Sequence, residues 1–487
     1  MFDTLSREIE RAGGLSGRQA MLEVNRRVLM GTIYDVLPFE FHEERRGSGE
    51  YVPLRQRRPN VRYNLCRLVV SDSVTFLFGE GRWPAIECAD RPTQQALADV
   101  LEESRFAAVM ADAAFQGSVG SVAVLMQVLK GRVFWRVMQT DCLTPAWDPE
   151  APDTLATVTE RYLVTGRDLR ERGYRVRDID LDARFWWQRL WGTDAETWFV
   201  PQTVEDANNG KPLVEDSSRS VRHGLGFVPL AWVCNLPGGI APDGACTFRP
   251  AVETSIEIDY QLSQAGRGLK YSSDPTLLIK EPAATDGEMV RSAANALVVS
   301  EKGDAKLLEI GGTASAAVIE YVRALREMAL ESVRGNRSNA DRVTAAQSGR
   351  AMELLHQALI NLADDLRISY GQTLLQLARM VVRARQRYPL QAFGAETPEM
   401  SLRDRLVLRW PPYFTPTHLD QQVEAGTLGT LRREGLMSQE TGVARTGATW
   451  DFVAQDELPR IKADEVAADA RAEAQAAQIQ DKQALPA

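Results

Sequence analysis

Hydrophobic residues recur three or four positions apart along several long segments of this chain, which is the spacing of one face of an α-helix. The longest apolar stripe runs from residue 348 to 388 and would extend about 60 Å as a helix. A helix of that length is unusual in a compact enzyme. The spacing predicts helices over residues 1–37, 62–78, 93–117, 249–271, 315–333 and 348–388.

The pattern changes between residues 118 and 235, where short runs of β-branched and aromatic residues alternate with turn signals such as Lys130-Gly131 and Asn209-Gly210. Strands this short, at this spacing, indicate an antiparallel sheet region. Outside it, strand-like runs occur at 276–279, 296–299 and 406–410. The predicted fold class is therefore α+β and mainly helical. The predicted strands of the sheet region are 119–129, 133–138, 156–165, 185–190, 197–200 and 227–233.

Composition narrows the class of protein. The chain has 487 residues, of which 44% are hydrophobic and 25% charged, so a collagen-like, wholly disordered or membrane-embedded chain is excluded. Its 57 basic and 66 acidic residues give a net charge of −9. A protein that grips nucleic acid over its whole surface is normally basic. Any contact with DNA is therefore expected to be local or weak.

The usual sequence signatures of catalysis and of cofactor binding are missing. There is no phosphate-binding GxxxxGK[ST], no HExxH and no GxSxG. The five cysteines form no CxxC pair, which argues against a zinc site or a disulfide framework and for a reducing compartment. The N-terminus is charged and has no apolar core of a signal peptide. We expect no catalytic residues, no metal, no cofactor and no enzyme activity.

A basic, polar loop lies between the last two predicted helices. Residues 334–350 contain four arginines and one acid, a local charge of +3 in a net-acidic protein. Such a loop is suited to touching a phosphate backbone without reading bases. The alternatives are a solvated basic loop and salt bridges between subunits.

The order of these elements resembles the portal proteins of tailed double-stranded DNA bacteriophages. Asn64–Asp72, followed by Phe76-Leu77-Phe78-Gly79, looks like that family's N-terminal helix and the turn that ends it. Residues 116–126, 135–138 and 145–148 are similar to its wing sheet. The likeness covers about 60 to 390 and also includes Gly226–Leu230 with Asn235, residues 260–275 and Ser348–Ala351.

That resemblance implies a ring, usually of twelve copies, at one capsid vertex, through which a separate terminase pumps DNA. The wing would span 1–248, the first stem helix 249–271, a small α/β clip 272–314 and the second stem helix 315–333. A tunnel loop would span 334–347, the long helix with the rest of the wing 348–450, and a crown or flexible tail 451–487. The tail carries eight acids and four bases, and is predicted to be a helix packed on a neighbouring copy or a frayed end.

The resemblance also assigns residues and partners. The loop would face double-stranded DNA without sequence specificity, and the clip would present charged contacts to the terminase large subunit. Major capsid and scaffolding proteins and a head-completion or tail adaptor protein would be further partners, with no membrane. The location would be the virion, assembled in a bacterial cytoplasm, or a gene-transfer particle. The loop residues are Arg334, Arg337, Asn339, Arg342 and Gln347, and the clip residues are Lys280, Asp286, Glu288, Lys302 and Lys306.

Two further hypotheses stay open on the residues alone. The chain is alternatively another structural assembly protein of a phage particle or contractile device without a DNA channel, or an enzyme whose site follows no motif. The tryptophans Trp186, Trp187, Trp191 and Trp198 would suit base stacking, but we expect them in a core or at a subunit interface. His356 is expected to be structural.

Overall fold

The computed structural model describes residues 1–15, 17–273, 276–282, 299–308, 313–336, 353–390, 405–414, 418–450 and 454–483. The chain divides into two compact units. The first comprises Met1–Arg337 and Ala358–Pro411, and the second comprises Ser338–Gln357 and Pro412–Ala487. Helices make up about 52% of the structure and antiparallel strands 18%. The predicted α+β class, mainly helical, is confirmed.

The N-terminal segment is two helices rather than the continuous helical segment predicted over 1–37. Helix α1 spans Phe2–Gly13 and ends at Gly14, whose φ of 59° is left-handed. Helix α2 spans Gly17–Met30 and is followed by the short 3-10 helix η1, Ile33–Val36. Only glycine adopts the left-handed conformation without strain, so the break follows from Gly14.

The helix predicted over 93–117 is also interrupted. Helix α4 (Arg91–Glu103) and helix α5 (Phe106–Gly117) are separated at Ser104 and Arg105, and Arg105 has a φ of 52°. Apolar spacing continues across the break, so periodicity alone does not reveal it. Helix α3 spans Leu65–Phe78, and its N-cap Asn64 accepts a hydrogen bond from the backbone N–H of Arg67 at 3.2 Å.

The predicted antiparallel strands form two separate sheets. In the smaller one, β2 (Ser121–Leu129) lies between β3 (Arg132–Gln139) and β10 (Leu230–Cys234). Lys130 and Gly131 both have positive φ, as a tight hairpin turn requires. The larger sheet has the order β4-β5-β6-β7-β9, with β8 paired to β6. Its strands are Leu143–Trp147, Leu155–Thr165, Arg184–Trp191, Ala195–Trp198, Gln202–Thr203 (β8) and Val221–Arg222 (β9).

Short helical turns connect the strands of this larger sheet. A capping box formed by Thr165 and Asp168 begins α6, in which the Thr165 side chain accepts from the Asp168 N–H at 3.2 Å. The α6 helix and η3 lie between β5 and β6, and α7 lies between β8 and β9. These connecting helices are α6 (Gly166–Glu171), the 3-10 helix η3 (Asp178–Asp180) and α7 (Val204–Asn208).

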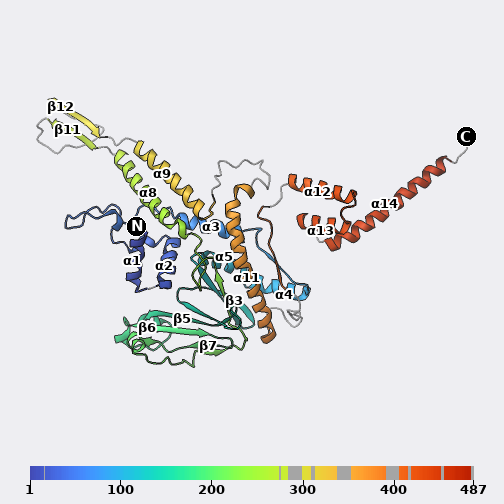
Figure 1. Ribbon diagram of the computed structural model, residues 1–487, viewed down its shortest axis with the longest axis horizontal. Coiled ribbons are helices and arrows are strands. Elements are labelled where there is room, and N and C mark those ends of the chain that lie inside the picture. Colours follow the sequence, from blue (N-terminus) through green and yellow to red (C-terminus); the bar gives the residue numbers. More distant parts are fainter. Residues whose placement is uncertain are drawn as a thin grey trace. The chain divides into compact units, whose positions relative to one another are not determined.

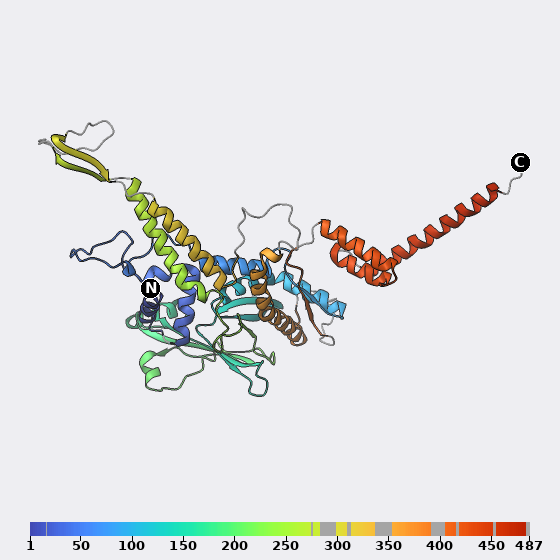
Figure 2. The ribbon, with the colours of Figure 1, turned by 45° about the horizontal axis from the view of Figure 1, so that its top comes forward.

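Two long helices pack side by side and project together from the first unit (Figures 1 and 2). The 3-10 helix η4 (Arg249–Ala251) leads into α8 (Val252–Ser273), and α9 spans Thr313–Ser332. Beyond their ends, β11 (Thr276–Pro282) pairs antiparallel with β12 (Val299–Leu308), so that Thr276 lies opposite Leu308. The pair and its hairpin stand away from both sheets (Figure 2).

The longest described helix of the first unit is α11, Gln357–Arg387. Its 31 residues span about 46 Å, less than the sequence predicts for 348–388. Residues 348–352 lie outside the described residues, and His356 interrupts the helical hydrogen bonding before α11 begins. The predicted strand at 406–410 is present as β13 (Val407–Arg409), which pairs with β1 (Ala85–Glu87).

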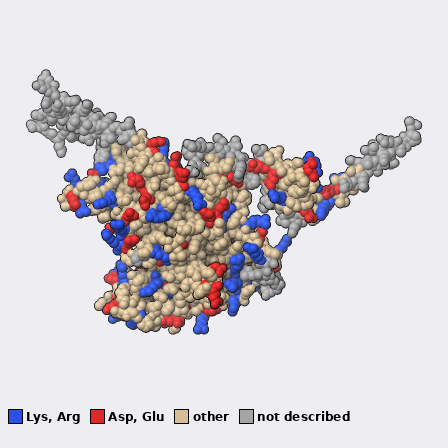
Figure 3. Space-filling model, viewed as in Figure 1, with Lys and Arg blue, Asp and Glu red and all other residues tan. Residues whose placement is uncertain are grey.

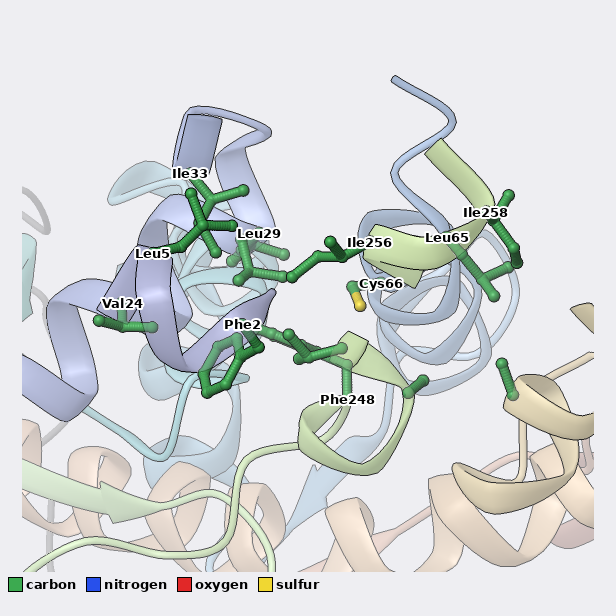
Figure 4. Packing of buried hydrophobic residues seen from close by; sticks show 14 of the residues in the cluster. Phe2, Leu5, Val24, Leu29, Ile33, Leu65, Cys66, Phe248, Ile256 and Ile258 are labelled. Atoms are coloured by element: carbon green, nitrogen blue, oxygen red, sulfur yellow. The ribbon is translucent and has the colours of Figure 1, made fainter. Parts of the chain in front are cut away.

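A hydrophobic core joins the base of the projecting helices to the N-terminal helices (Figure 4). Phe2, Leu5 and Leu29 of α1 and α2 pack with Ile256 of α8, and Leu65 of α3 closes the core. Burial of these side chains contributes about 2 kcal/mol each. Helix α9 joins the same core through Leu325, Ala329 and Leu330, and Val333, directly after the helix, packs into it as well. The pair is therefore anchored by apolar packing at its base.

The second unit consists of helices α12 (His418–Arg433), α13 (Gln439–Trp450) and α14 (Ala454–Gln483). Glu465 of α14 binds Arg432 at 3.0 Å and accepts from Gln439 at 3.0 Å, which ties the three helices together. The tail is helical over 454–483, and its predicted packing on a neighbouring copy stays a prediction. None of the described helices has the length and apolar character needed to cross a bilayer.

Candidate functional site

A buried polar cluster fixes the base of α8 to the N-terminal segment. The Asp259 side chain, 4% exposed, accepts from the Tyr34 hydroxyl at 2.7 Å and from the Tyr63 N–H at 2.7 Å. One turn away, the Ser263 hydroxyl accepts from the Val61 N–H at 3.0 Å. The Tyr260 hydroxyl donates to a backbone carbonyl, that of Arg57, at 2.8 Å. Side chains on successive turns of α8 are therefore hydrogen-bonded to the segment between residues 57 and 63.

Burial raises the pKa of the Asp259 carboxyl to about 6. Hydrogen bonds from Tyr34 and from the backbone N–H groups of Tyr63 and Asn64 favour the charged carboxylate and offset part of this rise in pKa. The same burial, together with the neighbouring carboxylate, raises the pKa of the Tyr34 hydroxyl. Tyr34 therefore remains a hydrogen-bond donor at neutral pH. Arg62, which stacks over the Tyr34 ring and pairs with Asp35, supplies a nearby positive charge.

Helix α9 has a packed face and an outward face. Leu325, Ala329 and Leu330 are buried, and Arg326 donates to the Tyr63 hydroxyl at 3.1 Å. The outward face keeps large apolar side chains in solvent, among them Met328 at 56% exposed. Tyr321, seven positions before Met328, lies on the same face of α9 and is also exposed, while the exposed Ile319 lies on the other side of α9 and Leu269 belongs to α8. Exposed apolar side chains grouped on one helix are typical of surfaces that pack against another protein.

Of the predicted tunnel-loop residues, only Arg334 lies within the described chain. Its guanidinium binds the Asp365 carboxylate of α11 at 2.7 Å, and its φ is 54°. The positive charge of Arg334 is therefore already paired with a carboxylate of the same chain. The other members, Arg337, Asn339, Arg342 and Gln347, lie outside the described residues, so their predicted role stays a prediction.

The predicted clip residues are partly placed. Lys280 lies in β11 opposite Asp304, and Lys306 lies in β12 opposite Leu278. Lys302 belongs to the irregular part of β12, where the register shifts. Asp286 and Glu288 lie outside the described residues. The hairpin thus brings three of the five predicted positions onto one two-stranded element, and their contact role stays a prediction.

The tryptophans form a core around a cation rather than an open stacking surface. Arg189 of β6, 6% exposed, binds Glu160 at 2.7 Å and Glu196 at 3.0 Å. Its guanidinium lies over the rings of three tryptophans, at 5.4, 4.1 and 4.9 Å from the ring centroids of Trp187, Trp191 and Trp198. Trp186 instead lies against Arg161, with the guanidinium carbon 4.4 Å from its ring centroid.

Sequence reasoning missed several of these residues. Asp259 sits in an ordinary amphipathic helix, and no motif distinguishes it from the exposed Glu253 and Glu257 of the same helix. Arg189 lies in a strand whose other residues are mostly aromatic, and an arginine inside such a strand is the one signal that could have indicated a buried ion pair. His356 packs against Phe414 with ring centroids 5.5 Å apart.

Among the described residues, no group of three or more histidine, cysteine, aspartate or glutamate side chains is arranged to hold a metal ion. The five cysteines are unbridged. The concave surfaces include a pocket of about 450 Å³ between α4, α5 and the segment before β1. Its lining is mainly apolar, with Trp83, Leu97 and Phe106, and contains none of the predicted site residues.

No family model matches the sequence, and none of the curated proteins does. Among solved structures, the chain is similar to one described as the neck of an empty GTA particle computed with C6 symmetry. The identity is 11% and the TM-score 0.39, with 79% of this chain and 89% of that chain covered. At this TM-score, fold and function have to be argued from the residues of this chain itself.

Proposed function

We propose that this chain is a portal-type protein, a non-enzymatic subunit that assembles into a ring around a channel for double-stranded DNA. The sequence resemblance supplies the class. The observation that carries the proposal is the projecting pair α8 and α9, which is anchored at its base by Asp259 yet exposes Met328 and Tyr321 on its outward side. Such a pair is suited to lateral packing against copies of itself in a closed ring.

In this proposal the contacts at the base of the pair fix the orientation of α8 and α9 in the first unit. The apolar core around Ile256 and the polar contacts of Asp259 and Ser263 hold α8 in one orientation. A symmetric ring needs the same orientation of the helix pair in each copy, because every interface repeats the same geometry. The channel, the terminase contact at the β11–β12 hairpin and the location in a particle are parts of the proposal that rest on the resemblance.

Ring formation by the purified protein tests the proposed assembly. Purified protein should form rings with a central hole in negative-stain images, and light scattering should give a mass that is a whole multiple of 54.1 kDa. Compact monomers at every concentration would overturn the proposal. Symmetry averaging of the rings then gives the copy number, expected from the resemblance to be twelve.

The channel is tested separately from the ring. We expect the double variant Arg337→Ala, Arg342→Ala to form normal rings and to impair DNA packaging or retention. The matched control is Arg175→Ala, Arg222→Ala, which removes two exposed arginines from the wing region. Normal packaging by the Arg337, Arg342 variant would remove the loop from the mechanism. Rings that pass no DNA would favour the alternative, an assembly protein without a channel.

A further inference from the structure

An exposed arm projects from the first unit next to α8. Residues 43–58 fold back on themselves, with Arg45 bridged to Tyr51 and the Val52 N–H bonded to the Glu44 carbonyl at 2.8 Å. Residues 45–51 are all exposed, and Gly49, with a φ of 83°, makes the reversal possible. This arm is the blue loop on the left of α8 in Figures 1 and 2.

The base of the arm is held firmly. Arg57, 2% exposed, donates to the Phe41 carbonyl at 3.2 Å and to the Tyr51 hydroxyl at 2.9 Å, and its guanidinium lies over the Tyr51 ring. Glu44 forms an ion pair with Arg267 of α8. An arm fixed at two points presents its tip in a defined direction, which lowers the entropic cost of binding.

The arm carries basic side chains, visible as blue atoms at the left edge of the first unit (Figure 3), and the described chain does not balance all of their charge. Arg46 pairs with Glu50 at 3.1 Å, and Arg58 pairs with Glu40 at 3.3 Å. Arg45 and Arg55 are exposed, and no ion pair to either is seen within the described residues. The Tyr51 side chain is 61% exposed, and Tyr51 is bridged to Arg45 across the turn of the arm. The arm thus presents an exposed guanidinium group beside an exposed aromatic ring, and a second exposed guanidinium group, that of Arg55, nearer its base.

The outward face of α9 offers the complementary chemistry. Glu320, Glu327 and Glu331 are exposed and lie seven and four positions apart, so they form one stripe along the helix. That stripe is opposite the buried face of Leu325 and Ala329. Glu320 is paired with Arg323 at 3.7 Å, which leaves Glu327 as the clearest acceptor for a new cation. The exposed Met328 lies beside it.

The arm and α9 lie on opposite sides of α8 in both views of the first unit (Figures 1 and 2). Two complementary surfaces on opposite flanks cannot meet within one chain, but head-to-tail packing of neighbouring copies would bring them together. Repetition of that contact closes a ring when the rotation allows it. The pairing of basic and acidic surfaces specifies the register of such neighbours.

We propose that the arm of each copy docks on the outward face of α9 of the next copy, with Arg45 and Arg55 facing Glu327 and with Tyr51 against Met328. This inference rests on the proposed ring and assigns its lateral contact. The occupant is a second copy of this chain, argued from the complementary charge and the exposed apolar residues on both surfaces.

The test uses charge reversal in the full chain. Arg45→Glu, Arg55→Glu and, separately, Glu327→Arg should raise the concentration needed for ring assembly by about tenfold or more, because like charges then face each other at every interface. Assembly is measured by light scattering and negative-stain counting. Circular dichroism and melting should match the wild type, since all three side chains are exposed. The matched control Arg175→Glu, Arg222→Glu should assemble normally.

The decisive measurement combines the changes. In a chain carrying all three substitutions, an acidic arm faces a basic α9 at every interface, so opposite charges again meet. In an equal mixture of the two defective variants, opposite charges meet at every interface of a ring in which the variants alternate. Both should assemble near the wild-type concentration. Unchanged assembly of the defective variants, or no recovery on combining them, would overturn the docking and leave the ring itself standing. A wild-type chain that never forms rings would overturn the proposed function, and the docking with it.

Discussion

The Tyr34 hydroxyl donates a 2.7 Å hydrogen bond to Asp259, 225 positions later in the chain. Through this bond the N-terminal segment holds the base of α8. The Tyr63 N–H bonds the other oxygen of the same carboxylate, and the Tyr63 hydroxyl accepts from Arg326 of α9. One aspartate thereby links the N-terminal body, the segment before α3 and both projecting helices.

Asp259→Ala should destabilise the first unit by about 2 to 4 kcal/mol, because the buried Tyr34 hydroxyl and Tyr63 N–H lose their acceptor. Tyr34→Phe removes only one bond and should cost about 1 kcal/mol. The free energy of unfolding is obtained from urea denaturation. The control is Asp99→Ala, which removes a partly exposed carboxylate from α4. A cost for Asp259→Ala no larger than that of the control would contradict the anchoring role.

The stability of the first unit should depend on pH through Asp259. Its pKa is raised from 3.8 to about 6 in the folded chain, so folding takes up a proton between these values. The stabilisation is complete below the unfolded pKa and is lost as the pH rises through about 6. The change amounts to at most about 3 kcal/mol.

Asp259→Asn isolates this effect, because the amide stays neutral at every pH. Relative to Asp259→Asn, the wild type should lose unfolding free energy between pH 4.5 and 7.5. Urea denaturation of both proteins at the two pH values measures the difference. A constant difference, or one of opposite sign, would show that Asp259 does not titrate in this range.

Removing the buried cation of the larger sheet should be costly. Arg189→Met leaves Glu160 and Glu196 without their partner in a half-buried setting and should cost about 3 to 5 kcal/mol. Adding Glu160→Gln and Glu196→Gln should recover most of that loss, since no charge then remains unpaired. Thermal melting followed by tryptophan fluorescence is a suitable readout because Trp187, Trp191 and Trp198 surround the site. Equal stability of the single and triple variants would argue against electrostatics as the cause.

Gly117 should resist substitution because α11 passes close to it. A β-carbon at this position would meet the Tyr370 hydroxyl and would lie 2.8 Å from Cγ1 of Val122. Gly117→Ala should therefore cost about 1 to 3 kcal/mol. Tyr370→Phe removes the clashing oxygen, which has no hydrogen-bond partner among the described residues, and should relieve part of the cost.

The comparison of the two single variants with the double variant gives the coupling energy. Gly266→Ala is the matched control, since open space surrounds that glycine in α8. If Tyr370→Phe leaves the cost of Gly117→Ala unchanged, the close approach is not the reason for the glycine.

The sequence alone determined the α+β class, the positions of the main helices and the antiparallel strands, because period and turn chemistry are local properties of the chain. The spacing of 249–271 and 315–333 was sufficient to predict α8 and α9 to within a few residues. The breaks at Gly14 and at Arg105 were missed, because left-handed residues interrupt a helix without changing its apolar spacing.

The tertiary structure alone decided which side chains act together. Asp259, Tyr34 and Tyr63 are far apart in sequence, and only chain packing brings a carboxylate to two donors in an apolar setting. The same holds for the arm and the acidic stripe of α9. No local sequence pattern predicts that these two surfaces lie on opposite flanks of α8. Local spacing specifies the face of an element, whereas the partner of that face depends on contacts between distant segments.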